Sequence, residues 1–193
     1  FCLLLLVLSA SVTWQQTLPA LTVIGAFSGF VLALMTVFKP SWSPMTAPLY
    51  ALCEGLFLGG VSQVFETRYP GIVSQAVFLT FAILGALLLT YKSGLIKATE
   101  NFKLGVAAAT GGIFFLYLIN MILGFFGKSI PMIHSASTFG ILFSLFVVIV
   151  ASLNLVLDFD FIEKGAEVGA PKHMEWYGAF GLLVTLIWLY LEI

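Results

Sequence analysis

The sequence predicts an all-α membrane protein built as a bundle of seven transmembrane helices, and three observations support this fold class. Hydrophobic residues make up 61% of the 193 residues, and the mean hydropathy is +1.10. Charged residues make up only 9%, against about 25% in a soluble domain. Apolar runs recur seven times, most of them near the roughly 20 residues that a helix needs to cross the hydrocarbon. They are continuously apolar rather than alternating, so helices are expected instead of a β-barrel.

The apolar runs are separated by short breaks that are polar or contain Pro and Gly. No linker is long enough to divide the chain, so we expect one transmembrane helical domain over residues 1–193. The predicted spans are 1–14, 20–38, 47–65, 72–91, 103–126, 135–159 and 175–193, and the breaks include 39–41, 66–71, 91–94, 127–131 and the acidic stretch 160–172.

The first run, 1–14, has two interpretations. Small residues at 8–11 suit the cleavage site of a signal peptide. The next run follows after only residues 15–19, which favours a truncated first membrane helix. Because the chain starts without Met and stops inside an apolar run, we expect both ends to be trimmed.

The composition also excludes several classes of function. A soluble enzyme or a disordered regulator would not carry this much apolar surface. A nucleic-acid binder would need a basic surface, but 8 Lys and Arg stand against 9 Asp and Glu. Cys2 and Cys53 lie in apolar stretches and are expected to be packing residues. We expect no cofactor and no nucleic acid, and the lipid bilayer is the first partner.

The positions of Lys and Arg predict the orientation, because these residues gather in cytoplasmic loops. Loops after even-numbered spans hold six of them and loops after odd-numbered spans hold two. The amino terminus and the stretch 160–172 are therefore expected in the cytoplasm, and the carboxyl end outside. The six are Lys39, Lys92, Lys97, Lys103, Lys164 and Lys172, and the two are Arg68 and Lys128.

Small and polar residues recur at helical spacing on several spans, as expected of faces that pack against other membrane helices. The face on the sixth span ends at the carboxylate of Asp158, and the face on the seventh ends at Glu192. The members are Ser137, Gly140, Ser144, Val147, Ala151, Asn154 and Asp158 on the sixth span; Gly178, Gly181, Thr185, Trp188 and Glu192 on the seventh; Ala47, Ala51, Glu54, Leu58 and Ser62, beside Gly55 and Gly59, on the third; and Gly25 and Gly29 on the second.

Five acids lie in or at the edges of the predicted spans: Glu54, Asp158, Asp160, Glu175 and Glu192. An ionised side chain near the bilayer centre costs about 2.5–3.5 kcal/mol even on insertion scales. No Lys or Arg lies deep in a span, so we expect nothing basic to neutralise these acids. Glu54 is roughly 10 Å inside its helix at 1.5 Å per residue. All of the five acids except Glu192 are expected to lie toward the cytoplasmic side of the bundle.

Each acid has a structural and a functional interpretation. Asp160 and Glu175 can be interfacial residues, and Glu192 can be the outer edge of a longer helix. Glu54 and Asp158, each on a small-residue face, favour an ion pathway, because acids select cations in pores. We predict a pathway lined by all of these except Glu192, with Asp158 and Asp160 as candidate ligands of Ca²⁺, which prefers several oxygen ligands. Crowded carboxylates also share protons, which would permit control by pH.

Four segments resemble the transmembrane Bax-inhibitor-motif family (Bax inhibitor-1-like), in its bacterial branch: 69–75, 143–147, 153–163 and 175–193. The similarity runs from about Pro48 to the end. The resemblance implies seven helices with the last surrounded by the others, a pH-sensitive Ca²⁺ leak, and links to cell-death suppression or membrane-protein quality control in some members.

One family residue carries over to this sequence, because Asp158 matches the acid of the sixth helix. In better-known members this acid pairs with a second Asp on the last helix, and the pair acts as pH sensor and gate. The comparable position here is Thr185, and the nearest acids are Asp160, Glu163 and Glu175. A gate made of two carboxylates would have to be rebuilt from these acids.

Two functions remain. The first is a pH-sensitive Ca²⁺ or other cation leak channel with a carboxylate gate near the cytoplasmic side. The alternative is a non-transporting regulator that binds another membrane protein, such as a membrane-bound protease. With either function, the protein is expected in the cytoplasmic (inner) membrane if the source is bacterial. An enzyme is not expected: His-Glu-x-x-His and Gly-x-Gly-Asp motifs are absent, His134 and His173 lie in or beside loops, and the last span has no Lys for a retinal Schiff base.

Overall fold

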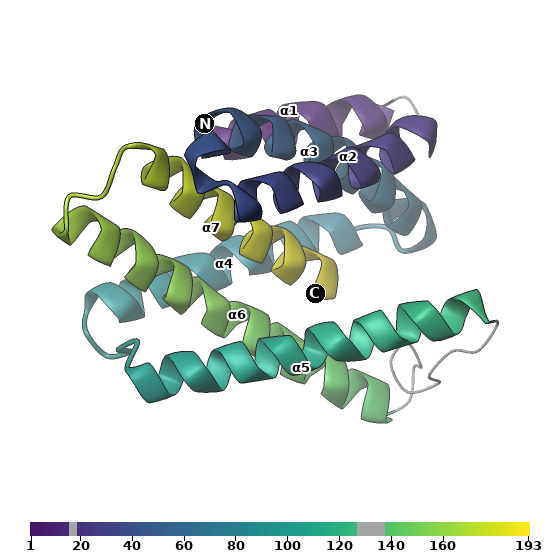
Figure 1. The fold of residues 1–193 in the computed structure, drawn as a ribbon. Coiled ribbons are helices and arrows are strands. Elements are labelled where there is room, and N and C mark those ends of the chain that lie inside the picture. Colours follow the sequence, from purple (N-terminus) through teal and green to yellow (C-terminus); the bar gives the residue numbers. More distant parts are fainter. Residues whose placement is uncertain (16–18, 127–137) are drawn as a thin grey trace. The chain divides into compact units, whose positions relative to one another are not determined.

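The computed structural model describes residues 1–15, 19–126 and 138–193, and these ranges contain seven α-helices, one short 3-10 helix and no strand (Figure 1). Lys128, His134 and Ser137 lie outside the described residues. The elements are α1 (Cys2–Gln15), α2 (Pro19–Phe38), η1 (Pro40–Trp42), α3 (Ser43–Arg68), α4 (Ile72–Lys92), α5 (Glu100–Phe125), α6 (Thr138–Glu167) and α7 (His173–Glu192).

Six spans in the described ranges are long and apolar enough to cross a membrane. They are α2, α4, α5, α6, α7 and the continuous segment of η1 and α3, Pro40–Arg68. The remaining helix, α1, is apolar but has 14 residues. The predicted all-α membrane bundle is confirmed. The role of α1, as a span or as a signal peptide, stays a prediction, and so does the orientation.

The largest difference between the predicted and observed helices is the end of α6. We predicted an acidic loop from residue 160, which is wrong, because the helix continues to Glu167. Glu and Lys are good helix formers, and the chain leaves the helix at Gly169, whose φ of 63° is a left-handed conformation that favours glycine. The 30 residues of α6 make a helix about 45 Å long, so its charged end extends beyond a hydrocarbon core of about 30 Å.

The start of α3 also differs from the prediction. The helix begins at Ser43 rather than at residue 47, and Pro48 lies inside it. Pro44 occupies the first turn, where a backbone N–H has no partner within the helix and its loss costs little. The predicted break at 39–41 lies where the structure has it, between α2 and α3, but the helix after it starts four residues earlier than predicted.

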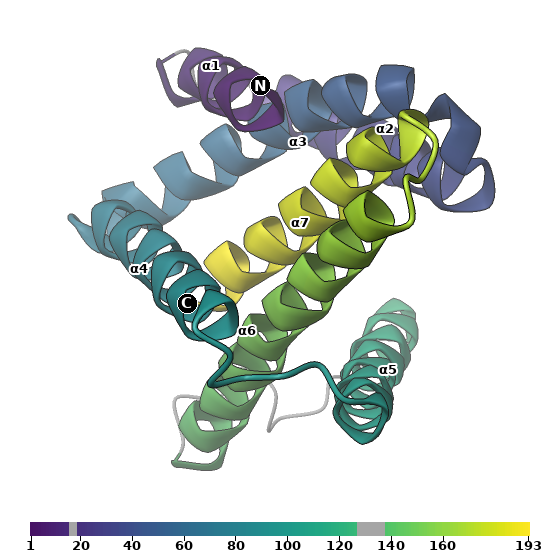
Figure 2. The ribbon, with the colours of Figure 1, turned by 90° about the vertical axis from the view of Figure 1, so that its left-hand side faces the viewer.

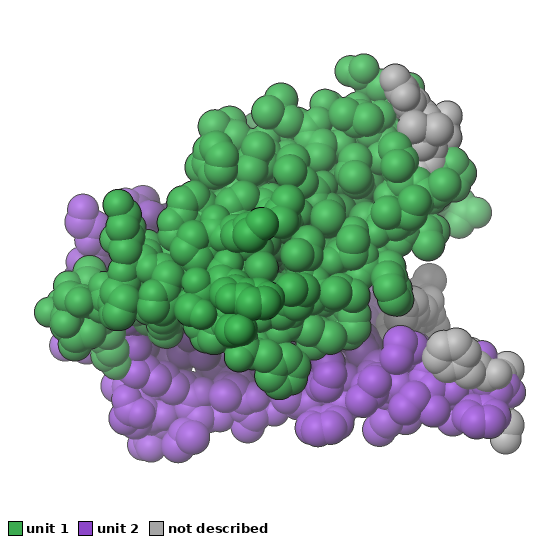
Figure 3. All heavy atoms as spheres, turned by 45° about the horizontal axis from the view of Figure 1, so that its top comes forward, with its two compact units in different colours: residues 1–78, 161–184 green, residues 79–160, 185–193 purple. Residues whose placement is uncertain are grey.

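The packed helices form two compact units (Figure 3). Unit 1 comprises residues 1–78 and 161–184, and unit 2 comprises 79–160 and 185–193. The division passes through α4, α6 and α7, so each of these helices contributes to both units. The single-domain organisation stays a prediction.

In unit 1, α3 packs against α1 and α2, and the three helices lie together in Figures 1 and 2. The contacts are close enough to need glycine, as the Gly-x-x-x-Gly spacing predicts. A Cβ added at Gly25 of α2 would lie 2.6 Å from the Cys53 carbonyl oxygen of α3. A Cβ at Gly59 of α3 would overlap the Ala10 carbonyl oxygen of α1, and one at Gly55 would also meet α1.

In unit 2, the apolar core lies where α5 and α6 meet. Its buried members are Ile113 of α5 with Val147 and Val150 of α6. Partly buried residues pack around them, namely Ala109, Tyr117, Phe143 and Trp188. Tyr117 and Phe143 are edge to face, with ring centroids 6.3 Å apart.

Candidate functional site

Asp158, the acid of the sixth helix, lies in unit 2 against the last helix. The hydroxyl of Thr185 on α7 hydrogen-bonds to the Asp158 carboxylate, and Thr185 is itself buried. The second oxygen, Oδ2, is buried and has no hydrogen-bond partner among the described residues. The hydroxyl supplies one hydrogen bond but no countercharge.

A buried carboxylate oxygen without a partner is costly, because water is removed from it and nothing replaces the lost hydrogen bonds. The cost of leaving such a group unsatisfied is about 1–3 kcal/mol, and more when the group is charged. Groups of this kind in membrane helices commonly mark ion or proton pathways. Asp158 is therefore the residue of unit 2 that most requires a functional explanation.

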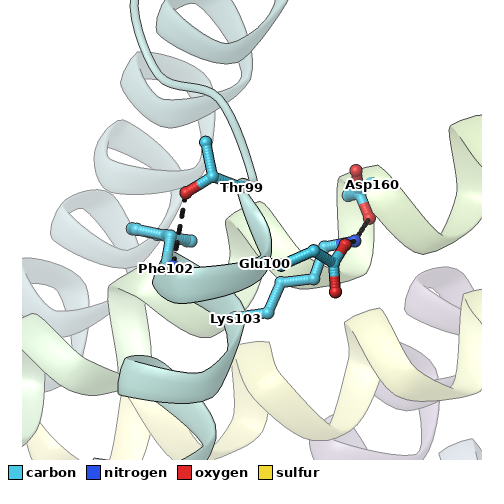
Figure 4. A network of polar contacts seen from close by, with 5 residues as sticks. All are labelled: Thr99, Glu100, Phe102, Lys103 and Asp160. Carbon is cyan, nitrogen blue, oxygen red and sulfur yellow. Dashed lines mark hydrogen bonds and ion pairs between the residues drawn. The ribbon is translucent and has the colours of Figure 1, made fainter.

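Asp160 is in a different situation, because a lysine neutralises it (Figure 4). The Lys103 ammonium lies 2.9 Å from Asp160 Oδ2 and 3.1 Å from Glu100 Oε1. Lys103 is in the first turn of α5, where Thr99 accepts a hydrogen bond from the Phe102 N–H at 3.3 Å. The expectation that nothing basic neutralises the acids is wrong for Asp160, because Lys103, which was expected in a loop, lies in the first turn of α5 within reach of Asp160.

Asp158 and Asp160 therefore have different partners. They are two residues apart on α6, which turns their side chains about 200° from one another. The described residues contain no group of three or more His, Cys, Asp or Glu side chains that could hold a metal ion. A Ca²⁺ ion held at this pair stays a prediction.

Asn154, one turn before Asp158, joins α6 to α5. Its Nδ2 donates to Thr110 Oγ1 at 2.7 Å and to the Val150 carbonyl at 2.9 Å. The sequence predicts Asn154 on a packing face, but no sequence signal identifies Thr110 as its partner.

Glu192, near the end of α7, accepts two hydrogen bonds from neutral donors. The Tyr117 hydroxyl lies 2.8 Å and the Trp188 Nε1 3.2 Å from Glu192 Oε1. The Ser144 hydroxyl lies 3.5 Å from the Glu192 carbonyl oxygen. The sequence offered the edge of a longer helix as one interpretation of Glu192 and did not identify Tyr117 as its partner.

The two acids of unit 1 differ in exposure. Glu54 of α3 is half-buried, and a Cβ at Gly29 of α2 would lie 2.6 Å from Glu54 Oε1, so this glycine leaves room for the carboxylate. Tyr50, one turn earlier, is buried and packs edge to face on Phe180 with ring centroids 5.0 Å apart. Glu175, in the first turn of α7, is exposed.

Three glycines of the predicted packing faces lie in buried or half-buried positions of α6 and α7. Gly140 and Gly178 are buried, and Gly181 is half-buried. A Cβ added at Gly178 would lie 2.9 Å from Ile162 Cγ1, so this position of α7 packs closely on the end of α6.

The comparisons with known proteins bear on the whole chain. The family model described as Bax inhibitor 1 like matches residues 1–193. The chain belongs to the Bax inhibitor 1 like family. Searches of curated proteins and of solved structures found no match. With its six candidate spans, this Bax inhibitor 1 like chain is an integral, multi-pass membrane protein. The family match also includes the first 47 residues, which lie before the start of the resemblance at about Pro48.

Proposed function

We propose that this Bax inhibitor 1 like protein is a passive, pH-sensitive leak for Ca²⁺ or another cation, and that Asp158 is its gate near the cytoplasmic side. If the source is bacterial, the protein would lie in the cytoplasmic (inner) membrane. The observation that carries the proposal is the buried, unpartnered Oδ2 of Asp158 on a membrane-spanning helix. A hard cation that arrives at this oxygen supplies the interaction that the protein does not.

The gate would work with a single carboxylate. Thr185, rather than a second acid, hydrogen-bonds to Asp158, so no second carboxylate competes for its proton at this contact. An ionised Asp158 attracts a cation and a protonated Asp158 does not, which makes the leak depend on pH. Asp160 would act differently, as an anchor between α5 and α6 through Lys103.

Two further acids were predicted to line the pathway. Glu54 supports this role, because it is half-buried on a membrane-spanning helix. Glu175 is exposed at the start of α7 and would act only by attracting cations to the entrance. Its removal should therefore change the leak less than the removal of Asp158.

The test is Ca²⁺ entry into dye-loaded proteoliposomes at pH 6 and pH 8. The unaltered chain, Asp158→Asn and the control Glu175→Gln are compared, each variant replacing a carboxylate by an amide of nearly the same size. We expect a leak above that of empty vesicles that changes in Asp158→Asn and is retained in Glu175→Gln. A flux equal to that of empty vesicles at both pH values would contradict the proposal and favour a non-transporting regulator of another membrane protein.

A further inference from the structure

One face of α5 carries polar residues at regular intervals. Lys103, Thr110 and Tyr117 are spaced by seven residues, which returns each to nearly the same side of the helix. Each contacts a polar partner on α6 or α7, and the distances are 2.9 Å to Asp160, 2.7 Å to Asn154 Nδ2 and 2.8 Å to Glu192 Oε1. The three levels cover about 21 Å along α5 at 1.5 Å per residue.

Such a column could serve only to join helices, because polar side chains hold membrane helices together. Asp158 indicates a role beyond joining helices. It follows Asn154 by four residues and so lies on the same side of α6, and its Oδ2 is buried without a partner among the described residues. A column that served only to join helices would not need a buried acid with an unsatisfied oxygen.

The column, meaning the polar contacts of Lys103, Thr110 and Tyr117 with α6 and α7, is interrupted by an apolar layer between the levels of Thr110 and Tyr117. Ile113 lies between Thr110 and Tyr117 on α5 and is 4% exposed. Val147 and Val150, which are 0% and 4% exposed, lie on α6 between the levels of Ser144 and Asn154. The three side chains pack against one another as the core of unit 2, and β-branched side chains are stiff at χ1. Hydrophobic constrictions of this kind block ions because they exclude water.

Glu192 lies on the far side of this layer from Asp158. On α7 it follows Thr185, the partner of Asp158, by seven residues, or about 10 Å along the helix axis. Tyr117 and Trp188 fix its position through hydrogen bonds. Both donors are neutral, so they orient the carboxylate without cancelling its attraction for a cation.

We propose that the layer of Ile113, Val147 and Val150 is the barrier that sets the rate of the leak, and that Asp158 and Glu192 receive the cation on its two sides. This inference rests on the proposed cation leak and deepens it. It places the barrier to flow at a dry contact between α5 and α6, whereas Asp158 remains the gate that responds to pH. Wetting the layer should therefore raise the flux even when both acids are intact.

The test introduces one hydroxyl into the layer and one outside it. Ile113→Thr places the hydroxyl in the buried layer, whereas Ile119→Thr makes the same change on the same helix at a side chain that is 51% exposed. Ca²⁺ entry into proteoliposomes is measured for both and for the unaltered chain. We expect Ile113→Thr to raise the entry rate severalfold, because the hydroxyl gives water a hydrogen-bond partner inside a layer that otherwise excludes it, and Ile119→Thr to leave the rate unchanged.

A second variant tests the far side of the layer. Glu192→Gln removes the charge but keeps an oxygen for Tyr117 and Trp188, and we expect it to lower the raised flux of Ile113→Thr. If Ile113→Thr does not fold, as judged by its elution in detergent, Val150→Thr replaces it. A leak that depends on Asp158 but is the same in the layer variant and the control would overturn the barrier and leave the proposed function standing. No leak in any of these proteins would overturn both.

Discussion

Gly59 provides a sharp test of the packing in unit 1. An alanine there would place its Cβ against the carbonyl oxygen of Ala10 and the hydroxyl of Thr13 on α1. The carbonyl belongs to a helix backbone, so relief requires α1 and α3 to separate rather than one side chain to rotate. Overpacking of this kind costs about 1–3 kcal/mol, and the better helix propensity of alanine returns up to about 1 kcal/mol. Because the overlap is with a helix backbone, we expect the upper half of the overpacking range, about 2–3 kcal/mol, so the net loss of stability is about 1–2 kcal/mol.

Gly85 of α4 is the matched control. It is also helical, but a Cβ added there meets nothing within 4 Å. In a chain of this size, 1 kcal/mol shifts Tm by about 2–4 °C. In thermal unfolding in detergent, Gly59→Ala should lower Tm by several degrees, and Gly85→Ala should leave it unchanged or raise it slightly. Equal Tm values for the two variants would refute the close packing of α3 on α1.

Two further predictions concern the polar contacts of unit 2. In a double-mutant cycle, Lys103→Met and Asp160→Asn should show a coupling free energy of about 1 kcal/mol, because the pair is only partly shielded from water; additive effects would contradict the ion pair. Asn154→Leu and Thr110→Val should each lower the free energy of unfolding in detergent by about 0.6 kcal/mol, and by no more than about 1.7 kcal/mol, the average and the largest value for hydrogen bonds between membrane helices. The double variant should lose little more than either single variant, and a full sum of the two losses would argue against their hydrogen bond.

The sequence predicted the helices well because apolar runs of membrane length have few alternatives in lipid. Their ends were less predictable, since charged residues such as Glu163 and Lys164 continue a helix as readily as they form a loop. The start of α3 was misplaced because proline is tolerated in a first turn. Local sequence patterns predict which segments are apolar, but they predict poorly the residue at which a helix ends.

The candidate site was only partly predictable. Asp158 and Thr185 could be singled out from their faces and from the family resemblance, and the structure joins them by a hydrogen bond. The seven-residue spacing of Lys103, Thr110 and Tyr117 is visible in the sequence, but it does not show which residues these side chains contact. The partners of Thr110, Lys103 and Tyr117 lie 44, 57 and 75 positions away, and no local pattern encodes such a pairing.

The most direct test of the central claim is the ratio of Ca²⁺ entry rates at pH 6 and pH 8 in proteoliposomes, compared between the unaltered chain and Asp158→Asn. If Asp158 is the titrating gate, the ratio differs from one in the unaltered chain and becomes one in the variant, while Glu175→Gln keeps the original ratio. The same ratio in the unaltered chain and in Asp158→Asn would contradict the account.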